Sequence, residues 1–139
     1  MGLIGQLKEE HVQLVHLFEE IKEGINVPSV NEEVLLETIS ELKEILSAHL
    51  DLENKLLYPK LAESDNAQAK ELGKKYSGEM VGILNTALAF FGKYVTVSGS
   101  ELKNNKTFET ELVAIIGVVA KRINVEENIL FPAFEKYCE

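Results

Sequence analysis

Six ionisable residues occupy positions where helical spacing otherwise places apolar side chains. They are His11, His49, Glu53, Glu79, Arg122 and Glu126. His49 lies four residues before Glu53, and Arg122 lies four before Glu126, so in a helix the members of each pair point the same way. Burying uncompensated charges costs several kcal/mol each. A polar layer inside the fold therefore needs internal compensation.

Formal charge allows two kinds of compensation. The three carboxylates and one guanidinium leave a charge of −2. A divalent cation with two neutral imidazoles brings the layer to zero, and so does protonating both histidines with no metal present. His and carboxylate ligands without a thiolate favour iron, with manganese or zinc as alternatives. The residue types thus predict either a buried metal site or a salt-bridge network.

The elements that must position these residues are four helices. Apolar residues recur at spacings of four and three, and three breaks, at residues 24–29, 62–66 and 97–107, separate the helical segments. Capping boxes at Ser29–Glu32 and Asp65–Gln68 predict the starts of two helices. Strand signals are weak. We expect an all-α, antiparallel up-down-up-down four-helix bundle that forms a single domain over residues 1–139.

Each predicted helix has one seam that faces the bundle core. The four seams are Ile4, Leu7, His11, Leu14, Phe18, Ile21 and Ile25; Leu35, Ile39, Leu42, Leu46, His49, Glu53 and Leu56; Leu72, Tyr76, Glu79, Ile83, Thr86 and Phe90; and Phe108, Leu112, Ile115, Val119, Arg122, Glu126 and Ile129. The third helix also has a second apolar stripe. It consists of Val81, Leu84, Leu88, Phe91 and Val95. Because bundle helices rarely need so wide an apolar face, this stripe predicts a homodimer contact.

The second and fourth predicted helices contain an internal repeat. Residues 49–59, HLDLENKLLYP, match residues 122–132, RINVEENILFP, without gaps. The aliphatic positions, the glutamate, the aromatic residue and the proline correspond, whereas His49 corresponds to Arg122. The first and third helices match more loosely, with His11 aligned on Glu79. The chain therefore looks like two duplicated helical hairpins, with the polar layer across their join.

These motifs resemble those of the hemerythrin-like, HHE cation-binding domain family over nearly the whole chain. His11 matches the first histidine of that family. His49 and Glu53 match its first H-x-x-x-E motif, which has the same aliphatic-aromatic-proline ending, and Glu126 matches the glutamate of the second motif. The resemblance implies a non-haem di-iron centre with both carboxylates bridging the irons. It also implies a role such as carrying or sensing dioxygen, handling iron, or responding to nitric oxide.

Two residues depart from the family pattern. Arg122 stands where the family has a histidine, and Glu79 stands where the third helix supplies one or two histidines. In one outcome the Arg122 guanidinium replaces the second cation and pairs with a site carboxylate, Glu53, Glu79 or Glu126. In the other, Glu79 becomes a ligand, Arg122 turns outward and two metals bind. A fixed positive charge repels a second cation at short range, so we expect a mononuclear or metal-poor site.

Composition narrows the partners and the compartment. The 139 residues include 23 acidic and 14 basic side chains, and the net charge of −9 argues against nucleic acid and anionic membranes as partners. The first residues lack the charged and apolar regions of a secretory signal. Cys138 is the only cysteine, which excludes an internal disulfide and fits a reducing compartment. We expect a cytoplasmic protein.

The favoured function is metal binding, with His11, His49, Glu53 and Glu126 as ligands and Glu79 as a further candidate. The alternative is a metal-free interaction protein in which an Arg-Glu-His network holds the polar layer. No nucleophile-base pair, Gly-rich phosphate loop or substrate motif indicates an enzyme. His16 is predicted to face away from the seam, since it follows His11 by five residues.

Overall fold

The computed structural model of the chain describes residues 2–26, 32–94 and 105–138, which form four helical rods. The first rod is α1 (Leu3–Asn26); the second joins α2 (Glu32–Leu52), the π-helical segment η1 (Glu53–Leu57) and α3 (Tyr58–Ala62); the third is α4 (Ala67–Tyr94); the fourth joins α6 (Lys106–Val125), the π-helical segment η2 (Glu126–Leu130) and α7 (Phe131–Tyr137). These residues contain no strand. The predicted all-α fold is confirmed.

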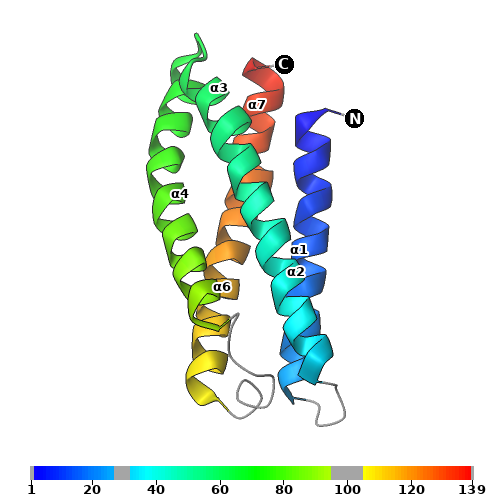
Figure 1. Cartoon of the computed structure of the whole chain (residues 1–139). Helices are drawn as coiled ribbons and strands as arrows, with labels where there is room; N and C mark the ends of the chain where they lie inside the picture. Colours follow the sequence, from blue (N-terminus) through cyan, green and yellow to red (C-terminus); the bar gives the residue numbers. More distant parts are fainter. Residues whose placement is uncertain (1, 27–31, 95–104, 139) are drawn as a thin grey trace.

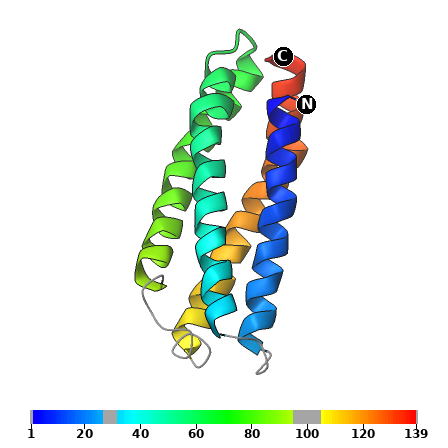
Figure 2. The same cartoon turned by 45° about the vertical axis from the view of Figure 1, so that its right-hand side comes forward.

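Successive rods run in opposite directions, so both chain ends lie at the same end of the bundle (Figure 1). α1 packs beside α2 and α6, and α4 packs beside α3 and α6. Turning the molecule shows α1 and the fourth rod side by side along the bundle (Figure 2). The predicted up-down-up-down arrangement is therefore confirmed.

The helix starts differ in part from the capping prediction. Asn66, and not Asp65, caps α4, because the Asn66 Oδ1 accepts a hydrogen bond from the backbone N–H of Ala69 at 3.0 Å. α6 starts in the same way, with Asn105 Oδ1 accepting from the N–H of Phe108 at 3.0 Å. The predicted capping box at Ser29–Glu32 and most of the break at residues 97–107 lie outside the described residues.

Both π-helical segments begin at a glutamate of the polar layer, Glu53 or Glu126. Hydrogen bonds in a π-helix join residues five apart, so each segment inserts one residue relative to an α-helix. The buried face consequently shifts by one position: Leu57 and Leu130 are fully buried. Their predicted counterparts are exposed, at 41% for Leu56 and 43% for Ile129. The seam prediction was wrong beyond each glutamate for this reason.

The seam prediction was also wrong for α4. Its buried face is made by Ala69, Gly73, Met80, Ala87, Phe90, Phe91 and Tyr94. Of the predicted seam only Phe90 is buried, while Glu79 and Thr86 are exposed. The prediction followed large apolar residues, whereas the buried face of α4 also contains the small residues Ala69, Gly73 and Ala87, and at Gly73 the helix approaches its neighbour closely. A Cβ on Gly73 would lie 2.5 Å from the backbone nitrogen of Ala62 in α3.

The stripe predicted as a homodimer contact divides between surface and core. Val81 and Leu88 are exposed, at 54% and 44%, but Phe91 belongs to the core. Val95 lies outside the described residues. The homodimer stays a prediction, with a smaller apolar face than the sequence suggested.

Within the described part of the chain, no helix is long and apolar enough to cross a membrane.

Candidate metal centre

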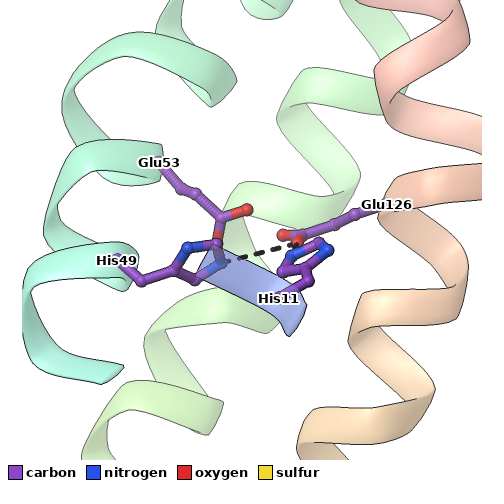
Figure 3. Close-up of side chains that lie close together, drawn as sticks. All are labelled: His11, His49, Glu53 and Glu126. Carbon is purple, nitrogen blue, oxygen red and sulfur yellow. Dashed lines mark hydrogen bonds and ion pairs between the residues drawn. The ribbon is translucent and has the colours of Figure 1, made fainter. Parts of the chain in front are cut away.

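Four buried side chains converge in the bundle interior from three of the four rods (Figure 3). They are His11 from α1, His49 from α2, Glu53 from η1 and Glu126 from η2. One ligand atom from each lies within 4.8 Å of the others. His11 and His49 are each 2% exposed, and Glu53 and Glu126 are fully buried. Among the described residues, this is the one such group of metal-ligand side chains.

The two imidazoles present their Nε2 atoms to this cluster. His11 Nε2 lies 2.9 Å from Glu126 Oε1, and His49 Nε2 lies 3.3 Å from Glu53 Oε1 and 3.9 Å from Glu126 Oε1. These separations are similar to those between ligand atoms that each lie about 2.0–2.2 Å from one metal. The donor set therefore fits a single cation coordinated by two nitrogens and two carboxylates.

The two Nδ1 atoms are oriented by glutamates from neighbouring rods. His11 Nδ1 lies 2.7 Å from Glu127 Oε2, and His49 Nδ1 lies 2.7 Å from Glu10 Oε1. Because a carboxylate accepts, each Nδ1–H donates, and this leaves Nε2 as the atom that can bind a metal. Carboxylates in this position fix the tautomer and raise the basicity of a metal-binding histidine.

The two site carboxylates differ in their hydrogen bonds. Glu126 is engaged at both oxygens, because Oε1 contacts His11 and Oε2 accepts a hydrogen bond of 2.8 Å from the Tyr58 hydroxyl. Glu53 is fully buried, yet neither of its oxygens has a hydrogen-bond partner among the described residues. A buried, unpaired carboxylate is costly unless it is protonated or coordinates a metal. This orphaned pair of oxygens is the feature that a cation would satisfy.

Protonation of the metal-free cluster follows from these contacts. Burial, and next the proximity of Glu126, raises the pKa of Glu53 well above its ordinary value. Burial works to raise the pKa of Glu126 as well, but interactions with Glu53 and the two histidines outweigh it and lower this pKa. Burial lowers the pKa of His11, but its contacts with Glu126 and Glu127 reverse that, and the net pKa is raised. The metal-free cluster therefore holds an ionised Glu126 beside a neutral Glu53.

Arg122 is buried near the cluster but does not join it. A cavity of about 10 Å³, the size of a water site, is lined by Arg122 together with His49, Glu53 and Glu126. Arg122 forms no ion pair with any residue that the structure describes, and its Nη1 has no hydrogen-bond partner there. Its guanidinium instead lies over the ring of Tyr76, 5.0 Å from the centroid. The predicted pairing of Arg122 with Glu53, Glu79 or Glu126 is absent.

Glu79 is the candidate ligand that the structure does not bring to the cluster. Its side chain is exposed on α4, where it lines a surface hollow with Tyr76 and Arg122. The reason is that the predicted core-facing side of α4 was wrong. The buried face of this helix lies at Gly73, Met80 and Ala87 and does not include Glu79. His16 is 70% exposed and pairs with Glu20, as its angular position predicted.

Glu10, Glu127 and Tyr58 were not predicted to belong to the site. Glu10 directly precedes His11 and Glu127 directly follows Glu126, but adjacent residues on a helix point about 100° apart, so their spacing predicts that they face away from the seam. Each instead orients a histidine of another rod. The repeat could have indicated Tyr58, because its counterpart is Phe131 and the two residues differ by the hydroxyl group.

The comparisons with known proteins give one match. A model of the family described as the Hemerythrin HHE cation binding domain matches residues 2–134 of the chain. No curated protein and no solved structure matches it. The buried His and Glu cluster is compatible with the cation binding in that description. Because the match covers nearly the whole chain, the chain belongs to the hemerythrin HHE cation-binding domain family.

Proposed function

We propose that this chain binds a single metal cation through His11, His49, Glu53 and Glu126. The observation that carries the proposal is the Glu53 carboxylate, which is fully buried with neither oxygen hydrogen-bonded to a described residue, and whose Oε1 lies 3.3 Å from the His49 Nε2 atom. Two neutral imidazoles and two ionised carboxylates would balance the charge of a divalent cation.

Iron is the metal that this donor set favours, since the ligands are imidazole and carboxylate with no thiolate. Iron held there would supply redox chemistry. By extension from the family, we propose oxygen or redox sensing, or iron handling, in the cytoplasm as the physiological role, with dioxygen or nitric oxide as small partners. The chain's own residues hold and orient: Glu10 and Glu127 fix the imidazoles, and Tyr58 fixes Glu126.

One metal, and not two, is supported by Arg122. Its position in the repeat corresponds to His49, so the second half of the bundle offers a guanidinium where the first offers an imidazole. Arg122 is 7% exposed and lines the same small cavity as Glu53 and Glu126. A permanent charge at that place repels a second cation.

The test is the metal content of untagged protein, in moles per chain, with absorption spectra recorded before and after exposure to air. We expect about one iron per chain and no oxo-bridge band. Two irons per chain would contradict the single-cation site. Absence of metal after anaerobic loading with ferrous iron would contradict metal binding altogether.

His49→Ala tests the ligand assignment, with His16→Ala as the matched control. The first removes an Nε2 that faces the cluster, whereas His16 is exposed on the surface of α1. A metal that binds only the folded chain stabilises it by about 2.7 kcal/mol when its free concentration is 100 times Kd. We expect His49→Ala to lose both bound metal and this stabilisation, and His16→Ala to keep both.

A further inference from the structure

A groove made of two joined hollows runs between α4 and α6. The first hollow, of about 580 Å³, has Lys75, Tyr76, Glu79, Ile83, Lys121 and Arg122 among its lining residues. The second, of about 360 Å³, has Ala89, Phe90, Ala114 and Ile115 among its lining residues. Thr86 and Val118 line both hollows, so the two are continuous. The combined size is in the range of small-molecule binding sites.

The first hollow is cationic although the chain as a whole is acidic. Lys75, Lys121 and Arg122 contribute three positive charges against the single carboxylate of Glu79, which leaves +2 in a protein of net charge −9. None of these four residues forms an ion pair with another described residue. Like charges gathered without a counter-ion repel one another, so an anion placed among them is stabilising.

Arg122 provides the buried part of this cationic end. It is 7% exposed, and its Nη1 has no hydrogen-bond partner in the described part of the chain. Glu53 and Glu126 share a small inner cavity with Arg122, but neither carboxylate forms an ion pair with it. A guanidinium that is nine-tenths buried, fixed over the Tyr76 ring and incompletely hydrogen-bonded is a suitable partner for an external carboxylate.

The rest of the groove is apolar and ends in a neutral ion pair. Ile83, Val118 and Ile115 form walls along it, and Val118 is 42% exposed. At the far end Lys93 Nζ and Glu111 Oε1 form an ion pair of 2.8 Å, which offers no free charge. Along α6 the distance from Arg122 to Glu111 is about 16 Å from the helical rise. This arrangement suits a molecule with one charged head and an extended apolar tail.

We propose that the groove between α4 and α6 binds an amphipathic monocarboxylate, with its head at Arg122, Lys75 and Lys121 and its aliphatic chain along Ile83, Val118 and Ile115. We assign a single negative charge to the head group, because the Glu79 carboxylate lines the same hollow and would repel a more highly charged anion. The groove borders the metal cluster at Arg122 but contains none of the four candidate metal ligands, and the proposal does not rest on the proposed function.

The experiment is a calorimetric titration of the whole metal-free chain with octanoate, with 1-octanol and acetate as comparison compounds. Octanol has the tail without the charge, and acetate has the charge without the tail. We expect saturable octanoate binding at one site and binding of both comparison compounds that is weaker by about tenfold or more. Equal binding of octanol and octanoate would overturn the role of the cations, and absence of saturable octanoate binding would overturn the site.

Matched variants locate the ligand. Val118→Glu places a carboxylate in the groove and is expected to abolish octanoate binding. Val113→Glu makes the same change at a 53% exposed position of α6 outside the groove and is expected to preserve octanoate binding. Lys121→Glu is expected to weaken binding about tenfold, and Lys70→Glu, on the exposed surface of α4, to leave it unchanged. Equal effects within either pair would overturn the location.

Arg122→Gln is the direct test of the buried cation. Removal of a charge-assisted hydrogen bond is expected to weaken octanoate binding by about tenfold or more. Circular dichroism tests whether this variant is folded. If Arg122→Gln does not fold, the Val118/Val113 and Lys121/Lys70 pairs still test the proposal. Because octanoate binding is measured on the metal-free chain, absence of metal binding and absence of octanoate binding are separate results.

Discussion

The hydroxyl of Tyr58 donates a hydrogen bond of 2.8 Å to Oε2 of Glu126, across the join between the two repeats. The counterpart of Tyr58 is Phe131, which has no hydroxyl and whose ring instead stacks on the ring of His11, with centroids 5.4 Å apart. Glu126 is consequently satisfied at both oxygens, and Glu53 at neither. The two groups that contact Glu126 are thus Tyr58 and His11, and their counterparts in the repeat are Phe131, which has no hydroxyl, and Glu79, which has no imidazole.

Tyr58→Phe should therefore destabilise the chain. The substitution keeps the ring but leaves Oε2 of Glu126 buried without its donor, which costs about 1–3 kcal/mol. The measurement is urea unfolding of the metal-free protein. Tyr137→Phe, at a half-buried tyrosine of α7, is the control and should change the free energy of unfolding little. Equal effects of the two substitutions would contradict the importance of the Tyr58 contact.

Glu10→Gln should weaken metal binding without abolishing it. Glu10 orients His49 through a contact of 2.7 Å, and loss of such an outer carboxylate typically lowers metal affinity about 10–100-fold. Competition with a chelator of known affinity measures the change. Glu9→Gln alters the neighbouring exposed residue in the same way and should keep full affinity. A Glu10→Gln protein with unchanged affinity would show that the contact plays no part in binding.

The positions of the cluster residues on the helices were predictable because α1, α2 and α6 keep regular spacing up to the glutamates. Leu14, Leu46 and Val119 lie on the predicted seams and are buried, and they position His11, His49 and Arg122 in the interior. The register past Glu53 and Glu126 was not predictable, since a π-helical insertion leaves no simple periodic signal. Spacing alone could not show that Leu57 replaces Leu56.

α4 was predicted poorly because two adjacent stripes on it satisfy the same spacing. The stripe with Tyr76, Glu79 and Ile83 has the larger side chains in this part of the helix, whereas the buried stripe contains Gly73 and Ala87. Which stripe faces inward depends on how closely α3 approaches, and this is a property of the packed bundle. The contacts of Glu10 and Glu127 with histidines of other rods are also tertiary, and residue spacing within one helix carries no record of them.

The metal-free protein should be most stable at mildly acidic pH. The pKa of His11 is raised above 6.5, so its stabilisation is complete below 6.5 and is lost as the pH rises through the folded-state pKa. The raised pKa of Glu53 likewise removes stability as the pH rises above 4.5. The lowered pKa of Glu126 acts oppositely, with stability present above 4.5 and lost on acidification. We expect the maximum between pH 4.5 and 6.5 and a decline towards alkaline pH.

Glu53→Gln checks the cause of that decline. An uncharged amide of the same shape cannot ionise, so the metal-free variant should lose less stability than the unchanged chain as the pH rises from 4.5. It should also bind metal more weakly, because a carboxylate ligand is gone. Urea unfolding across this pH range gives the first result and metal content the second. An undiminished pH dependence in Glu53→Gln would exclude Glu53 as its source.

Gly73→Ala should destabilise the bundle through the contact of α4 with α3. The added methyl group would lie 2.5 Å from the backbone nitrogen of Ala62 and 2.8 Å from the Cβ of Leu61, so the two helices must move apart. Overpacking of this kind costs about 1–3 kcal/mol. Gly78→Ala is the matched control on the same helix, because a Cβ there meets no described atom within 4 Å. Alanine also favours a helix over glycine by about 0.5–1 kcal/mol. Thermal unfolding should therefore show a lower Tm for Gly73→Ala and an equal or higher Tm for Gly78→Ala; a Tm raised equally by both would mean that the α3–α4 approach is not close enough to exclude a side chain.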